Sequence, residues 1–190
     1  MQKEIGQYGY LTRGIRAVTE AVSRPKPTEQ RLIEYCVLHT TASPQSWGWQ
    51  AIRSYFLNTL RWRTEGYHVV IDAFGGVKRL VPNNQPSNGI LPFGRISNRN
   101  SVNISYIGGI DNKGLPVDNR TEKQKEALKN VVLWYLKHYP DIVFLGHNQI
   151  ELKMCPCFDV RSWLTQIGVP SKNIYQHDNY NVIRWHKLVA

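Results

Sequence analysis

Short apolar runs separated by polar segments divide the chain into strands and helices. Runs rich in apolar residues predict five strands, over residues 34–40, 66–72, 77–81, 101–107 and 142–145. Gly75-Gly76 joins the second and third runs and predicts a hairpin. Apolar residues at intervals of three and four predict helices over residues 10–23, 46–61, 121–139 and 159–167. Strands and helices alternate loosely, which favours an α/β fold with a mixed central β-sheet flanked by helices.

The same pattern suggests how the chain is divided. We expect residues 1–30 to form an N-terminal appendage with a helix, residues 31–168 to form one domain, and residues 169–190 to form a C-terminal tail. Thr121-Glu122-Lys123-Gln124 fits a capping box at the start of a helix. Residues 82–99 are rich in proline, asparagine and glycine and predict a long loop, and such loops inside compact domains are often functional.

Composition narrows the class of protein. With 190 residues and 42% hydrophobic residues, the chain fits a single globular domain, and no stretch is apolar enough to cross a membrane. The first eight residues lack the apolar core of a signal peptide, so we expect synthesis in the cytosol and delivery to any external substrate by release or lysis. The three cysteines do not resemble a disulfide framework.

A net charge of +10 points either to a solubilising surface or to an anionic polymer. The polymer could be a nucleic acid or a cell-wall glycopeptide that carries carboxylates and phosphates. The basic residues are scattered, and the sequence contains no finger, zipper or aromatic sheet signature of a nucleic-acid-binding module. Nucleic acid is therefore the less favoured partner.

The densest group of metal-binding side chains lies between residues 146 and 159. His147 follows a predicted strand, and Cys155 lies eight residues further on. Imidazole and thiolate are preferred ligands of zinc, but a site needs at least a third ligand. His39 ends another buried strand and fits that role, although a histidine there is also typical of a hydrogen-bonded core residue. His39, His147 and Cys155 together would leave the fourth position of zinc open, as in a catalytic site.

Four segments of the chain match a family pattern in the right order. They are Val37-Leu38-His39-Thr40-Thr41-Ala42-Ser43, Gly66-Tyr67-His68-Val69-Val70-Ile71-Asp72, the stretch 100–111, and Gly146-His147 with Lys153-x-Cys155-Pro156. Together they resemble the zinc-dependent N-acetylmuramoyl-L-alanine amidases that share a fold with peptidoglycan recognition proteins, and most of all the phage lysozyme-type amidases. The resemblance covers about residues 31–168.

The resemblance implies a role for each matching residue. His39, His147 and Cys155 would bind Zn²⁺. Tyr67 would donate a hydrogen bond to the oxyanion of the tetrahedral intermediate, and Lys153 would add positive charge there or help move a proton to the leaving amine. Without the resemblance, Tyr67 would be interpreted as an ordinary strand residue and Lys153 as a solvated loop residue.

The sequence also departs from the family pattern. Cys157 stands where the family usually has glycine, so a second thiol lies near the metal; the resemblance favours Cys155 as the ligand, and whether Cys157 also contacts the metal stays open. Asn103 and Ser105 replace more common residues of their strand. The segment 87–99 looks longer than usual and lacks the His-Ala-Gly sequence of many members. These departures affect the prediction of substrate preference more than that of the chemistry.

The resemblance implies a peptidoglycan hydrolase that cleaves the amide between N-acetylmuramic acid and L-alanine with a zinc-activated water. We expect a monomer that is made without a signal peptide and acts on the cell wall after release. One alternative is a non-catalytic peptidoglycan-binding module on the same fold, which Cys155 argues against because binding-only relatives generally lack that ligand. A basic nucleic-acid-binding protein is the other alternative, and it accounts for the charge but for none of the four motifs.

Overall fold

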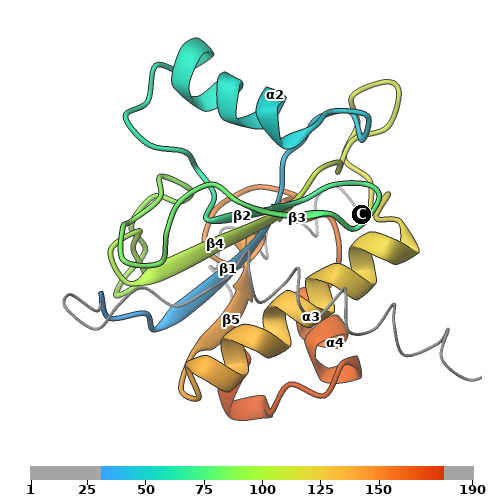
Figure 1. The fold of residues 1–190 in the computed structure, drawn as a ribbon. Helices are drawn as coiled ribbons and strands as arrows, with labels where there is room; N and C mark the ends of the chain where they lie inside the picture. The colour runs from blue at the N-terminus through green and yellow to red at the C-terminus, as the bar shows by residue number, and fades with distance from the viewer. Residues whose placement is uncertain (1–30, 178–190) are drawn as a thin grey trace, which may run out of the picture.

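A five-stranded mixed sheet forms the centre of the computed structural model, which describes residues 31–177 (Figure 1). The strands are β1 (Tyr35–Thr40), β2 (Val69–Ile71), β3 (Val77–Arg79), β4 (Ser101–Tyr106) and β5 (Val143–Gly146). Their spatial order is β3-β2-β4-β1-β5. β4 runs parallel to β1 and β2, β5 runs parallel to β1, and β3 forms the predicted antiparallel hairpin with β2. The predicted mixed sheet is confirmed, while the helix predicted within residues 1–30 lies outside the described residues.

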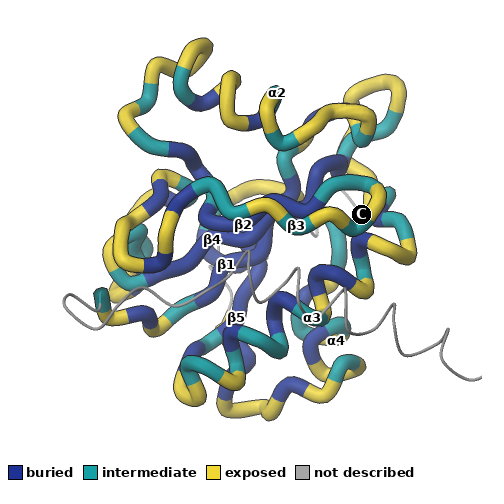
Figure 2. Tube along the Cα trace, viewed as in Figure 1, coloured by how far each residue is buried: buried dark blue, intermediate teal, exposed yellow. Residues whose placement is uncertain are grey.

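Two helices cover one face of the sheet. They are α3 (Glu122–His138) and α4 (Val160–Gln166), and Figure 1 shows both on the same side of the strands. The buried side chains between these helices and the sheet form the largest apolar cluster, which includes Cys36, Leu38, Ile104, Leu128 and Val131. Figure 2 shows β1, β2, β4 and β5 as mostly buried, whereas β3 at the edge of the sheet is partly exposed. The apolar spacing that predicted the helix of residues 121–139 marks the side of α3 that faces the sheet.

The start of α3 is fixed by side chains. Thr121 accepts a hydrogen bond from the backbone N–H of Gln124, and the side chain of Gln124 accepts one from the backbone N–H of Thr121. The predicted capping box is therefore confirmed. Gln124 also donates from Nε2 to the backbone oxygens of Ile71 and Ile107, so the same residue joins α3 to the ends of the strands.

The opposite face carries α2 (Trp49–Ser54), which continues as a π-helical turn, η2 (Tyr55–Thr59). The predicted helix of residues 46–61 therefore starts late and is not uniform. Ser46, the first residue of the predicted range, lies in a turn that is closed by a hydrogen bond from Trp47 N–H to the Pro44 oxygen. The helix therefore begins after Gly48, which caps it without a side chain.

The remaining part of this face is covered by residues 82–99, called here the long loop. Its residues Ile90 and Ile96 are buried in a cluster with Val37 of β1 and Leu145 of β5. From the predicted C-terminal tail, residues 169–177 are described, and Ile174 packs into the large cluster of the other face. Within residues 31–177, no helix is both long and apolar enough to cross a membrane.

Candidate metal centre

Adjacent parallel strands bring two histidines together. His39 is the fifth residue of β1, and His147 directly follows β5, whose last residue, Gly146, pairs with Leu38. Because both strands run in the same direction, both histidines lie at carboxyl ends of the sheet, where open α/β sheets commonly bind ligands. Their ring centroids are 4.4 Å apart, and both residues are buried.

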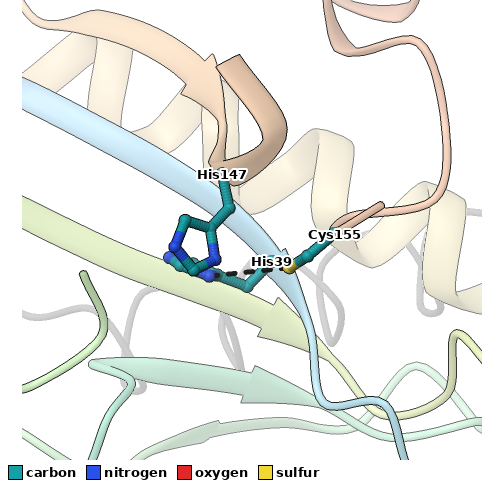
Figure 3. Close-up of side chains that lie close together, drawn as sticks. All are labelled: His39, His147 and Cys155. Carbon is teal, nitrogen blue, oxygen red and sulfur yellow. Dashed lines mark hydrogen bonds between the residues drawn. The ribbon is translucent and has the colours of Figure 1, made fainter. Parts of the chain in front are cut away.

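Cys155 completes a group of three possible metal ligands (Figure 3). One ligand atom from each of His39, His147 and Cys155 lies within 4.8 Å of the others. The Sγ atom of Cys155 is 3.7 Å from Nδ1 of His39 and accepts a hydrogen bond from the backbone N–H of Thr40 at 3.2 Å. The structure therefore brings together the three residues that the sequence singled out as zinc ligands.

The protonation states of these groups suit a metal site. Burial, followed by the nearby His147, lowers the pKa of His39 well below its usual value, so its ring is neutral and has a lone pair to share. Burial raises the pKa of the Cys155 thiol to about 12 in the protein alone. A divalent cation is the kind of partner that stabilises such a buried thiolate, and two imidazoles with one thiolate match the donors that zinc prefers. The residues present therefore fit zinc.

Each histidine has a side-chain partner at Nε2. Nε2 of His39 lies 2.9 Å from Oδ1 of Asn103. Nε2 of His147 lies 2.8 Å from Oε1 of Glu151, at ion-pair distance but without the alignment of a linear hydrogen bond. Such partners orient metal-binding histidines and fix their tautomers. Sequence reasoning noted Asn103 as a departure from the family pattern and missed Glu151, although its position four residues after His147 was a usable signal.

Tyr67 lies against the metal-binding group. Its ring centroid is 5.2 Å from that of His39, and its hydroxyl donates to the Thr40 oxygen at 3.3 Å. Burial raises the pKa of Tyr67 well above its usual value, so the hydroxyl stays protonated and can donate. Tyr67 also borders a pocket of about 290 Å³. The pocket is lined by Thr41, Ala42, Ser43, Pro44, Trp47, Ile52, Tyr55, Phe56 and Tyr67.

Lys153 is held at the rim of the site. Its Nζ lies 2.8 Å from Oε2 of Glu151, and its side chain is 52% exposed. Burial alone would raise the pKa of Glu151, but the contacts with His147, the Leu91 N–H and Lys153 hold it well below its usual value. Glu151 is therefore a carboxylate that touches both the candidate ligand His147 and the predicted catalytic lysine.

The second thiol points elsewhere. Sγ of Cys157 lies 3.4 Å from the backbone oxygen of Gly109, and among the described residues the metal-binding group contains Cys155 and not Cys157. Cys157 has a φ of 70°, in the left-handed region that favours glycine. This backbone angle is consistent with the glycine that the amidases described above usually carry at this position.

The fold and this site define an α/β protein with a candidate His-His-Cys metal centre beside a pocket. The chain belongs to the N-acetylmuramoyl-L-alanine amidase family, whose model matches residues 29–158. This membership confirms the predicted family and the predicted activity class, peptidoglycan hydrolysis by an amidase. Zinc dependence is typical of the family.

Several sequence relatives are phage endolysins. The chain is 27% identical to the endolysin of Enterobacteria phage T3 over 140 residues, and this alignment covers 74% of this chain and 88% of the endolysin. It is 35% identical to the endolysin of Enterobacteria phage K11 over 103 residues, and this alignment covers 54% of this chain and 66% of the endolysin.

Solved structures agree with the fold. The Ph2119 endolysin from a Thermus scotoductus bacteriophage matches with a TM-score of 0.59 and 26% identity, over 72% of this chain and 86% of that one. The amidase LysC from Clostridium intestinale matches with a TM-score of 0.60 and 18% identity, over 78% and 94%. Drosophila PGRP-LB matches with a TM-score of 0.60 and 17% identity, over 80% and 88%. The last two matches concern the fold alone.

Proposed function

We propose that this protein hydrolyses the amide between the lactyl group of N-acetylmuramic acid and L-alanine, with a zinc ion bound by His39, His147 and Cys155. The observation that carries the proposal is the meeting of these three ligand atoms within 4.8 Å of one another at the carboxyl ends of adjacent parallel strands. Three protein ligands leave one position of zinc for water or substrate. When bound, zinc supplies Lewis acidity for the attack of water on the amide carbonyl.

The surrounding residues would act on the charge that develops during the reaction. Tyr67 offers a protonated hydroxyl beside the metal-binding group and is our candidate donor to the oxyanion. Lys153 is our candidate for stabilising that charge or for passing a proton to the leaving amine. Both assignments follow from the family resemblance and agree with where the two side chains lie.

The pocket beside Tyr67 is our candidate for one arm of the substrate site. Its walls include the aromatic rings of Trp47, Tyr55 and Phe56, with Thr41 and Ser43 adding hydroxyl groups. Apolar walls with a few polar groups are typical of ligand sites. The endolysin relatives support action on the cell wall after release.

Product analysis tests this proposal. Purified peptidoglycan is digested with the zinc-loaded protein and analysed by mass spectrometry, with the His39→Ala variant as a control. We expect stem peptides with a new N-terminal L-alanine and glycan chains of unchanged length, and no such peptides from His39→Ala. New sugar ends, cleavage within the peptide, or full activity of His39→Ala would contradict the proposal. Binding without any product would favour a binding-only module.

A further inference from the structure

The long loop lies on the same side of the sheet as the metal-binding histidines. Ile90 and Ile96 of the loop are buried with Val37, which belongs to β1. Side chains alternate along a strand, so Val37 and His39 face the same side. The loop is therefore packed beside the site, and its polar groups are within reach of the residues that support the two histidines.

One series of hydrogen bonds runs from the loop to His39. The backbone N–H groups of Gly89 and Ile90 both donate to Oδ1 of Asn98, at 3.1 and 3.2 Å. A backbone N–H can only donate, so these contacts fix the orientation of the Asn98 amide. Nδ2 of Asn103 faces the same Oδ1 at 3.3 Å, which turns Oδ1 of Asn103 toward Nε2 of His39. Nε2 must then carry the proton, and Nδ1 keeps its lone pair.

A second series runs from the next residue of the loop to His147. The backbone N–H of Leu91 donates to Oε1 of Glu151 at 2.9 Å. The same oxygen lies 2.8 Å from Nε2 of His147, and the other oxygen holds Lys153. A carboxylate can only accept, so this contact at ion-pair distance favours the tautomer of His147 that carries its proton on Nε2 and leaves the lone pair on Nδ1.

We propose that Asn103 and Glu151 are positioning residues that connect the two metal-binding histidines to the long loop and fix their tautomers. The proposal rests on the proposed function, because it takes His39 and His147 as metal ligands. Three consecutive backbone N–H groups, those of Gly89, Ile90 and Leu91, begin both series. The conformation of this short stretch of loop therefore positions both Asn103 and Glu151 beside the histidine rings.

Close packing strengthens the connection to His39. A Cβ atom built on Gly89 would lie 2.6 Å from Cγ of Asn103, so the loop backbone rests directly on the amide. Nδ2 of Asn103 also donates to Oγ of Ser87, at 2.9 Å. Asn103 and Ser87 are both buried, and water competes little for these bonds.

Zinc affinity measured by competition with a chelator tests the proposal. We expect Asn103→Leu and Glu151→Leu to bind zinc roughly ten- to a hundredfold more weakly, which is the usual effect of removing such a partner. Asn103→Asp and Glu151→Gln keep an oxygen toward the histidine, so these variants should retain most of the wild-type zinc affinity. The matched controls, Asn58→Leu and Glu122→Gln, alter exposed side chains away from the site and should stay within about twofold of wild type.

Hydrogen exchange at the loop gives a readout that a general loss of stability would not reproduce. Coupling between two sites is reciprocal, so zinc binding should slow amide exchange at residues 89–91 of the wild type. In the double variant that carries both Asn103→Leu and Glu151→Leu, a saturating concentration of zinc should no longer slow amide exchange at these residues.

Either of two results would overturn the proposal: zinc affinities of both leucine variants within about twofold of wild type, or exchange at residues 89–91 that zinc leaves unchanged in the wild type. A different result bears on the proposed function. If His39→Ala keeps its zinc and still releases peptides with N-terminal L-alanine, the metal centre itself is assigned wrongly.

Discussion

At the scale of single residues, burial sets the chemical state of the groups at the site. It lowers the pKa of His39, so that the ring is a neutral ligand, and raises the pKa of Tyr67, so that the hydroxyl is a donor. The same effect makes the Cys155 thiol a poor acid unless a cation is present. A buried imidazole, phenol and thiol therefore form a site that is suited to a metal ion and to an oxyanion.

Removing the hydroxyl of Tyr67 tests its proposed role. Tyr67→Phe should keep its zinc and lower kcat roughly ten- to a thousandfold, because a donor aimed at developing charge acts in the transition state. The measurement is the initial rate of peptide release together with zinc content per chain. Tyr35→Phe, in the same strand as His39 but at its other end, is the control and should keep the wild-type rate. Equal rates for Tyr67→Phe and wild type would assign the oxyanion donor elsewhere.

At the scale of elements, the first turn of α3 joins the helix to the sheet. The Thr121 hydroxyl accepts from Gln124 N–H at 3.1 Å and donates to the Ala73 oxygen at 2.8 Å, while Gln124 reaches the ends of two strands. This joint lies on the side of the sheet that α3 and α4 cover, away from the long loop. We therefore expect it to contribute to stability rather than to chemistry.

The variant Thr121→Ala should separate the contribution to stability from any contribution to catalysis. Loss of the cap should lower the free energy of unfolding by about 1 kcal/mol while the rate of peptide release stays unchanged. Denaturant unfolding measures the first quantity, and a peptide-release assay measures the second. Thr165→Ala on the exposed surface of α4 is the control and should change stability by less than about 0.5 kcal/mol. A large loss of activity in Thr121→Ala at unchanged stability would contradict this division.

Local signals predicted the elements well where they act within a few residues. The capping box at Thr121 and the hairpin at Gly75-Gly76 both depend on neighbours in sequence, and both are confirmed. The start of α2 was predicted wrongly, because the turn closed by Trp47 outweighs the capping tendency of Ser46. The support of the histidines by Asn103 and Glu151 depends on the path of the long loop, which periodicity does not encode.

At the scale of the whole molecule, the sheet brings together groups that are far apart in sequence. His39 and Cys155 are 116 residues apart, yet Sγ and Nδ1 lie 3.7 Å from each other. The order of four family motifs predicted this group with Cys155 as the thiol, whereas the spacing of the residues alone did not choose between Cys155 and Cys157. In the structure Cys155 joins the group, and the thiol of Cys157 lies against the backbone oxygen of Gly109 instead. The net charge of +10 also suits a wall polymer that carries carboxylates and phosphates.

Bound zinc per chain, measured with peptide release for Cys155→Ala and Cys157→Gly, tests the central claim most directly. The claim is that His39, His147 and Cys155 hold a catalytic zinc whose fourth position is open. We predict that Cys155→Ala loses tightly bound zinc and activity, and that Cys157→Gly keeps one zinc and remains active, because glycine suits the φ of 70° at this position. Loss of zinc from Cys157→Gly with retention by Cys155→Ala would contradict the account.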